Sequence, residues 1–276
     1  SQMRSVARQI AEKRGWENGD LMHVMAELKK ETIPEGKILE VYESRLAAIE
    51  EMIRKHDVIT LPERNASIRL ATEAESASIP APFMSPPQLI GNTGQYGEFV
   101  LVQSNPALEG EDSKMDDWNH DSVTWALTVH EARPGHEMQF AALVENGTSL
   151  ARITYAFNSA NVEGWGLYSE AIMMEYLPLE GQLFTLLARL QRAARMFMDP
   201  MVNLGLLTPE DAVDFMINRS VFPGQWPAQK PTAMPFWHRG RPLRITTVIA
   251  ICRGYAPRLR WHWASALTSA SIMIFC

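Results

Sequence analysis

The stretch VHEARPGHEMQ, residues 129–139, holds side chains that could bind a metal ion. His130 and His136 offer imidazole nitrogens, and Glu131 follows the first of them. Zinc peptidases often carry such residues as His-Glu-x-x-His, in which two histidines four apart share one helical face. Here they are six apart, and an undistorted helix would turn them about 240° from each other. The two imidazoles could then not share an ion.

Pro134 and Gly135 lie between the histidines and change this expectation. Proline ends a helix at or before the preceding residue, and glycine adopts backbone angles that other residues avoid. A bulge that absorbs two residues would return His136 to the place of the second histidine in the zinc motif. We therefore predict that His130 and His136 bind one metal ion, and that Glu131 acts on a water molecule bound to it.

A catalytic zinc ion takes three protein ligands and keeps one position open, so a third ligand must come from another helix. The stretch NVEGWGLYSE, residues 161–170, offers Glu163 and Glu170, which share a helical face. Gly164 and Gly166 are poor helix formers, which indicates a close approach by another segment or a ligand. We predict Glu163 as the ligand. Glu170 orients a ligand histidine, replaces Glu163, or caps a solvated face.

Four further residues are candidates for supporting the ligands or for binding substrate. Arg133 either binds a substrate carboxylate or is an exposed side chain of the bulge. Tyr168, Asp199 and Asn203 are the other three. A row of arginines on one helix is expected to form salt bridges, with a substrate carboxylate as the alternative partner: Arg189, Arg192 and Arg195.

The elements that must position these residues are mostly helical. Amphipathic spacing predicts helices at about 3–14, 20–31 and 35–56, from about 122 onward, and from 208. Residues 67–72 and 98–104 alternate like strands, and prolines around them exclude long helices. Strand 98–104 is either an edge that pairs with an extended peptide or an inner strand. We expect a mainly α fold with a small β-sheet, of the α+β class.

Composition limits the class of protein. The 276 residues suit one large domain or two small ones, and a net charge of -6 argues against a nucleic-acid partner. No apolar run is long enough to span a membrane, and the two cysteines do not form a disulfide framework. The chain begins at Ser1, so we expect that a natural N-terminus with its signal is absent. We leave oligomeric state and compartment open, with export as a periplasmic protein or lipoprotein as one possibility.

The two motifs, His130-Glu131-x-x-Pro134-Gly135-His136 and EGWGLYSE at residues 163–170, resemble the bacterial domain-of-unknown-function family 885. They are similar in outline to the gluzincin metallopeptidases, in which two histidines and a downstream glutamate bind zinc. The resemblance covers most of residues 1–218. It implies a zincin-like catalytic domain from the C-terminal portion of a longer protein. This sequence departs from the family at Gly166, usually alanine, and at Asn203, where the family tends to place a histidine.

The end of the chain differs sharply from the rest. Residues 1–214 hold 18 basic and 32 acidic side chains, a net charge of -14, whereas residues 215–276 hold eight basic side chains and no acidic ones. A one-base shift lets the codons of residues 229–248 encode EADRYAFLAPGQATSYYYG, which contains the Arg-Tyr and Pro-Gly-Gln-x-x-Ser-Tyr-x-x-Gly pattern of the family. We therefore predict a catalytic domain at residues 1–220 and an aberrant, frameshifted tail at 221–276.

These observations predict a zinc-dependent hydrolase with one Zn²⁺ ion. The expected activity is that of a metallopeptidase that cleaves a peptide or small amide, with Glu131 as the general base. The alternative is a non-catalytic relative that keeps the scaffold and binds a peptide or a partner. Asn203 and the tail favour weak activity or none in this chain.

Overall fold

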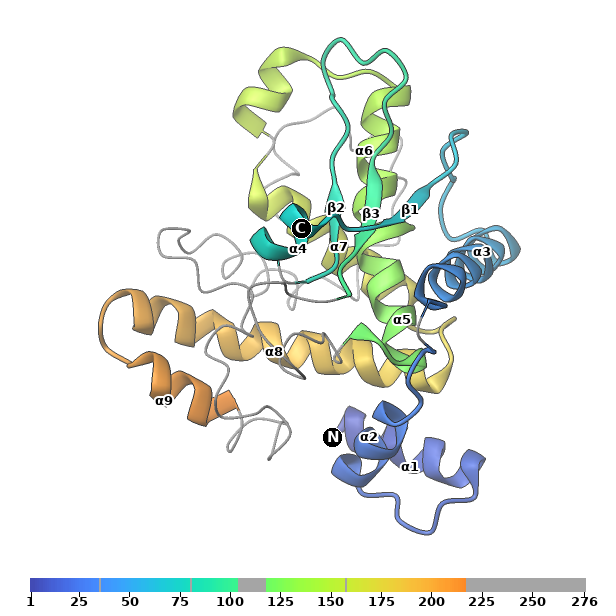
Figure 1. The fold of residues 1–276 in the computed structure, drawn as a ribbon, viewed down its shortest axis with the longest axis vertical. Helices are drawn as coiled ribbons and strands as arrows, with labels where there is room; N and C mark the ends of the chain where they lie inside the picture. The colour runs from blue at the N-terminus through green and yellow to red at the C-terminus, as the bar shows by residue number, and fades with distance from the viewer. Residues whose placement is uncertain (35, 80, 104–117, 157, 217–276) are drawn as a thin grey trace.

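The chain is described here from a computed structural model (Figure 1). The described residues are 1–34, 36–79, 81–103, 118–156 and 158–216. The tail predicted at 221–276 lies outside them. Within the described ranges no helix is both long enough and apolar enough to cross a membrane.

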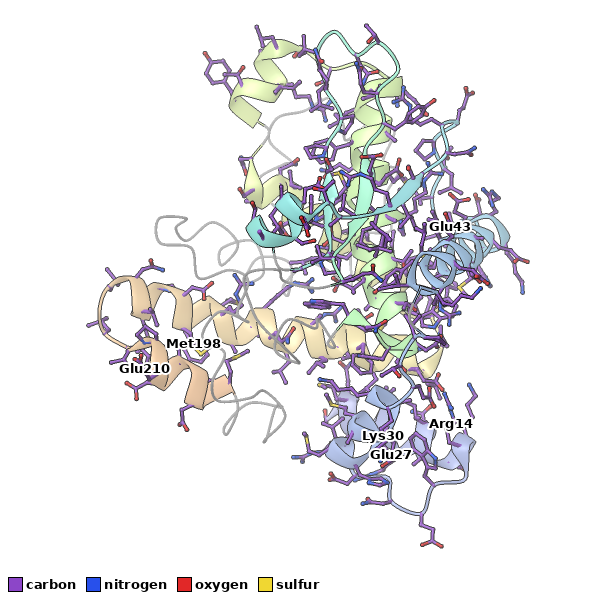
Figure 2. The ribbon with its side chains drawn as sticks, viewed as in Figure 1. Arg14, Glu27, Lys30, Glu43, Met198 and Glu210 are labelled. Atoms are coloured by element: carbon purple, nitrogen blue, oxygen red, sulfur yellow. The ribbon has the colours of Figure 1, made fainter. Side chains whose placement is uncertain are left out.

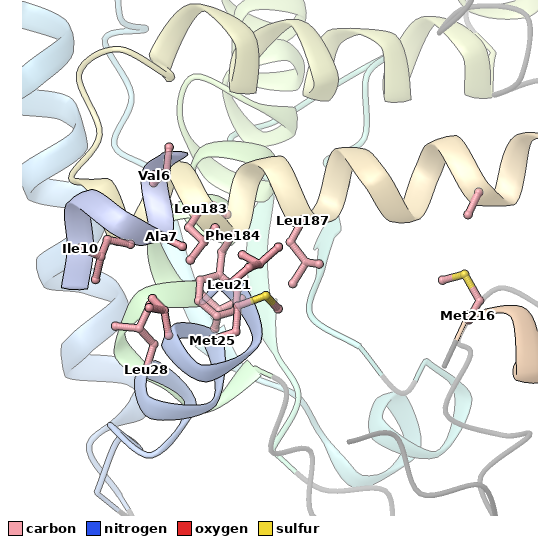
Figure 3. Close-up of a cluster of buried hydrophobic side chains, with 14 of the residues drawn as sticks. Val6, Ala7, Ile10, Leu21, Met25, Leu28, Leu183, Phe184, Leu187 and Met216 are labelled. Carbon is pink, nitrogen blue, oxygen red and sulfur yellow. The ribbon is translucent and has the colours of Figure 1, made fainter. Parts of the chain in front are cut away.

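Helix α8 (Leu179–Asn203) runs across the lower half of Figure 1, and α1 (Gln2–Arg14) and α2 (Leu21–Lys29) lie below it. α1 packs against both α8 and α2. α2 begins at Asp20, whose carboxylate accepts a hydrogen bond from the backbone of Met22. Apolar residues at helical spacing on the three helices form a buried cluster that fixes α8 in place (Figure 3). Its members include Ile10, Val24, Leu28, Leu183, Phe184 and Leu187.

Charged side chains line the outer ends of α1 and α2. Figure 2 labels Arg14 at the end of α1, and Glu27 and Lys30 at the end of α2. Lys30 Nζ lies 2.6 Å from Glu27 Oε1, while Arg14 bridges Glu31 and Glu180 at 2.8 and 3.1 Å. The exposed pair of Lys30 and Glu27 adds little stability, so burial of the apolar cluster dominates.

Helix α3 (Ile38–His56) and α5 (Asp121–Leu127) contact each other beside the site. The guanidinium of Arg45 on α3 donates to Asp121 and to the hydroxyl of Thr124, and lies over the ring of Trp125. The buried ring of Tyr42 meets Phe99 edge-on at 5.5 Å. α3 is thereby joined both to the sheet and to the helix that leads into the stretch from His130 to His136.

Three strands form one sheet among the described residues, in the order β1-β3-β2. β1 (Ser67–Leu70) pairs parallel to β3 (Glu98–Leu101), and β2 (Phe83–Ser85) pairs antiparallel to β3. The interpretation of strand 98–104 as a peptide-binding edge is therefore wrong, because β3 has a neighbour on each side. Helix α4 (Glu73–Ser78), which follows β1, starts with a capping box between Thr72 and Glu75.

The remaining elements carry the site or follow it. α5 continues into a π-helical turn, η3 (Thr128–Ala132), and α6 (His136–Glu145) begins after a break. Next come η4 (Arg152–Ala156), α7 (Ser159–Met173), α8, and α9 (Pro209–Asp214), which starts at Thr208 as predicted. The structure is thus mainly helical with a small sheet, which confirms the α+β class.

Candidate metal centre

The Pro-Gly turn brings the two histidines together. The chain widens into the π-helical turn η3, passes a cis peptide bond at Arg133–Pro134, and restarts as α6 with Gly135 as N-cap and His136 as first residue. The imidazole rings of His130 and His136 lie 4.6 Å apart between centroids, nearly perpendicular to each other at 83°. Both rings are buried. Six residues of spacing therefore still yield two adjacent imidazoles.

Two glycines allow the close packing of this turn. A Cβ on Gly135 would lie 1.9 Å from the carbonyl oxygen of His130 and 2.3 Å from that of Val129, so only glycine fits. A Cβ on Gly166 of α7 would lie 2.6 Å from Cε1 of the His130 ring. The expectation that another segment approaches the glycines of 161–170 is met at Gly166, because the His130 ring lies against it.

Glu163 on α7 lies within reach of both histidines. Its Oε2 is 3.6 Å from Nε2 of His130 and 4.0 Å from Nε2 of His136. Ligands about 2.05 Å from a tetrahedral zinc ion would be about 3.3 Å from one another. The two distances from Glu163 exceed this spacing by about 0.3 and 0.7 Å, and the chemistry of the donors, two imidazoles and a carboxylate, suits zinc.

Glu131 is a second carboxylate at the same place. Donor atoms of His130, Glu131 and His136 all lie within 4.8 Å of one another, so this triplet could also hold an ion. Glu131 differs from Glu163 in accepting a hydrogen bond from the backbone of Met84 in β2. Burial raises the pKa of Glu131 to about 7, even though the charge of His130 opposes the rise. Such a pKa suits a group that accepts a proton near neutral pH.

On its other side, His130 meets a buried carboxylate. Nδ1 of His130 lies 2.7 Å from Oε1 of Glu170, whose side chain is 2 % exposed. Arg192 on α8 contacts the same carboxylate with two nitrogens, NH2 at 2.9 Å from Oε1 and NH1 at 3.0 Å from Oε2. Of the three roles considered for Glu170, this geometry favours orienting a ligand histidine, because a ligand imidazole commonly donates its other N–H to a carboxylate.

Burial and neighbouring charges determine the protonation of the two histidines and of Glu163. Burial alone would lower the pKa of His130, but the carboxylates of Glu163 and Glu170 raise it to about 10. Burial would raise the pKa of Glu163, but His130 brings it down to about 2. Burial, and then the charge of His130, lower the pKa of His136 to about 3. His136 is therefore neutral and ready to ligate, whereas His130 must release a proton to do so.

Arg133 is not where the sequence led us to expect it. The side chain is 2 % exposed, so it is neither a surface group nor available to a substrate carboxylate. Its Nε donates to Glu137 at 2.9 Å, NH1 donates to Glu50 of α3 at 2.7 Å, and NH2 donates to the carbonyl of Arg64. Both predicted roles are corrected: Arg133 faces away from the histidines and ties the turn to α3.

Helix α7 also holds the turn in place. The indole N–H of Trp165 donates to the carbonyl oxygens of Pro134 and Gly135 at 2.9 and 3.0 Å. The hydroxyl of Ser169 donates to Pro134 at 3.1 Å. Sequence spacing did not single out these anchors. The only signal was that Trp165 and Ser169 lie in the same stretch as Glu163.

The remaining candidates make contacts of other kinds. Asp199 accepts from Arg195 at 3.2 Å, and its carbonyl accepts from the exposed side chain of Asn203 at 2.7 Å. Two turns of α8, about 10 Å, separate Asp199 from Arg192. Tyr168 packs against the ring of Trp165 at 6.0 Å. The salt-bridge prediction for the arginine row is confirmed at positions 192 and 195.

Fold and site together define an α+β protein with a buried His/Glu cluster at a π-helical turn. Residues 1–225 match the family described as "Bacterial protein of unknown function (DUF885)", and the chain belongs to that family. Comparison with curated proteins finds no match.

Two solved structures share the fold. One is titled the putative lipoprotein from Colwellia psychrerythraea, with 19% identity and a TM-score of 0.69 over 99% of this chain and 46% of that one. The other is a putative lipoprotein of unknown function from Shewanella oneidensis, with 18% identity and a TM-score of 0.67 over 99% of this chain and 52% of that one. The chain therefore spans about half the length of these two proteins.

Proposed function

We propose that this protein is a zinc-dependent hydrolase, and that its reaction is the cleavage of a peptide or similar amide bond. The observation that carries the proposal is the convergence of two imidazole Nε2 atoms on one carboxylate oxygen, Oε2 of Glu163, at 3.6 and 4.0 Å. Three such ligands leave one position of a tetrahedral ion open, as catalytic rather than structural zinc sites do.

The residues divide into ligands and a base. His130, His136 and Glu163 would hold the ion, which when bound would lower the pKa of a water molecule and polarise a carbonyl. Glu131 accepts the proton of the attacking water and passes it to the leaving amine. We assign the base to Glu131 because it directly follows His130, as the general base follows the first histidine in His-Glu-x-x-His.

An extended polypeptide is the substrate that best suits the surroundings. β2 is an outer strand of the described sheet, and the backbone of Met84 in this strand faces Glu131. A peptide that paired with this edge would pass beside the site, with main-chain hydrogen bonds that tolerate many side chains. We also propose that the natural protein is exported, because both structural relatives are titled lipoproteins.

Zinc content tests the ligand assignment. The wild-type chain should retain one zinc per molecule after dialysis, measured by plasma mass spectrometry. His130→Ala and Glu163→Gln should lose it, while His23→Ala on α2 is the matched histidine control and should keep it. Equal zinc in wild type and His130→Ala would refute the site. If Glu131→Gln loses zinc and Glu163→Gln keeps it, the third ligand is Glu131 instead.

Cleavage of a peptide library, with and without a chelator, tests the activity. Glu131→Gln should bind zinc normally and lose turnover by at least about 10²-fold, the lower range for a general base. A wild-type chain that binds zinc but shows no chelator-sensitive cleavage would support the alternative of a peptide-binding relative. Asn203, which is exposed and donates a hydrogen bond to the carbonyl of Asp199, is the described residue that favours this alternative.

A further inference from the structure

Arg192 makes a two-pronged contact with the carboxylate behind His130. Its NH2 lies 2.9 Å from Oε1 of Glu170 and its NH1 lies 3.0 Å from Oε2. This fork is the arrangement in which a guanidinium fixes both the position and the plane of a carboxylate. The same NH2 lies 3.3 Å from Nδ1 of His130, so the three side chains are in mutual contact.

The contact determines where the imidazole of His130 points. Oε1 of Glu170, held by the fork, lies 2.7 Å from Nδ1 of His130. A proton on Nδ1 then donates to this oxygen and leaves the lone pair on Nε2, the atom that faces Glu163. Without the fork, the buried carboxylate of Glu170 would lose its partner of opposite charge and could rotate or draw in water.

The helix that carries Arg192 is rigidly anchored elsewhere. Leu183 and Leu187 of α8 are buried in the cluster that α1 and α2 complete (Figure 3). Arg192 follows Leu187 by five residues, so the packing of the N-terminal helices places the guanidinium against Glu170. The side chain of Arg192 is 20 % exposed, and both of its terminal nitrogens already contact Glu170. Because these nitrogens pair with Glu170, we do not assign Arg192 a contact with substrate.

We propose that Arg192 is a positioning residue of the metal centre, whose fork on Glu170 orients His130 for ligation. This inference rests on the proposed function, because it assumes that His130 binds the ion. The inference goes beyond the proposed function because Arg192 contacts neither the ion nor the substrate. It also predicts that α8 and the N-terminal helices, remote in sequence from the motif, contribute to metal affinity.

Zinc affinity, measured by competition with a chromophoric chelator, tests the inference independently of turnover. Removing a partner that orients a ligand typically weakens metal binding about 10–100-fold, and we expect this loss in Arg192→Gln. Arg192→Lys should recover part of it, because lysine supplies the charge but not the fork. Arg195→Gln is the matched control on the same helix. Its side chain is 24 % exposed and also pairs with an acid, Asp199, and the affinity should stay within about 3-fold of wild type.

A double-mutant cycle shows whether Arg192 acts through Glu170. In a Glu170→Gln background, Arg192→Gln should weaken zinc binding further by less than about 3-fold, because the shared contact is already lost. Additive losses would overturn the proposed route. A cooperative unfolding transition of each metal-free variant shows that the variant is folded. If Arg192→Gln does not fold, Arg192→Lys is used for the test instead.

The outcomes separate the two proposals. If wild type binds no zinc, the proposed function fails and this inference falls with it. If wild type binds zinc and Arg192→Gln binds it equally well, the inference alone is overturned. Equal losses in the 192 and 195 variants would also overturn it, because they would indicate a general effect of helix charge.

Discussion

Replacing Arg133 by methionine removes a buried charge and keeps a similar side-chain volume. The guanidinium is 2 % exposed and donates to Glu137, which is 0 % exposed, and to Glu50, which is 17 % exposed. The other oxygen of Glu137 has no hydrogen-bond partner among the described residues. Arg133→Met would therefore leave Glu137 without its cationic partner, while Glu50 keeps a contact with Arg54 at 2.9 Å.

The expected loss of stability follows from this difference in burial. Breaking a buried ion pair by removing one partner costs about 3–5 kcal/mol. In a domain of about 200 residues, 1 kcal/mol corresponds to about 2–4 °C in Tm, so the Tm should fall by about 6–20 °C. Arg54→Met is the matched control. It removes an arginine that pairs with the same Glu50 but is 62 % exposed, and the loss should be about 0–1 kcal/mol.

Thermal unfolding with chelator present, followed by circular dichroism, measures both variants without any contribution from bound metal. Glu137→Gln provides a second test if Arg133→Met does not fold, because it removes the buried charge and keeps an acceptor for Arg133. We expect it to lose less stability than Arg133→Met. If Arg133→Met and Arg54→Met unfold within about 2 °C of each other, the argument that the buried network holds the turn is refuted.

Three further predictions concern the turn and the core. Gly135→Ala would place a Cβ 1.9 Å from the carbonyl oxygen of His130, and relief of this contact would displace the His130 ring. We expect zinc binding to weaken about 10–100-fold, the range for disturbed ligand orientation. Gly19→Ala, with a nearest contact of 3.4 Å, is the control and should bind zinc normally in the same titration; equal affinity of the two variants would refute the argument. Trp165→Phe removes the indole N–H that donates to the carbonyl oxygens of Pro134 and Gly135, and should lower the free energy of unfolding by about 1–3 kcal/mol. An unchanged midpoint in urea unfolding would show that these hydrogen bonds do not stabilise the turn. Burial lowers the pKa of His120 to about 3, so as pH falls below about 6.5 the unfolded chain binds a proton that the folded chain does not, and the folded state loses stability. Between pH 7 and 5, wild type should lose about 2 kcal/mol more of its free energy of unfolding than His120→Gln. Parallel pH profiles of the two proteins would contradict this.

Local sequence patterns predicted most of the helices. Apolar spacing placed helices at 3–14, 20–31 and 35–56, and the structure has α1, α2 and α3 at Gln2–Arg14, Leu21–Lys29 and Ile38–His56. The buried faces agree with the spacing because side chains three and four apart in a helix lie on the same side. Strands were predicted near 67 and 98, where β1 and β3 lie. α4 and β2 were missed, since six and three residues are too few to show a period.

The sequence predicted the candidate ligands of the site but not the residues that surround them. The two motifs sufficed to choose His130, His136 and Glu163, because ligand chemistry and spacing are properties of short segments. The pairing of Arg133 with Glu50, 83 residues away, could not be predicted in this way. Neither could that of Arg192 with Glu170, which lies on another helix.

The sequence by itself determined which helices form, which faces they bury, and which side chains could ligate a metal, because these depend on residue type and local spacing. Only the tertiary structure decided that Arg133 is buried against α3, that β2 lies beside Glu131, and that α8 brings Arg192 behind His130. The reason is physical. A charge finds its partner according to how whole helices pack, and that packing is determined by apolar clusters such as the one around Leu183 and Leu187, which are assembled from segments far apart in the chain.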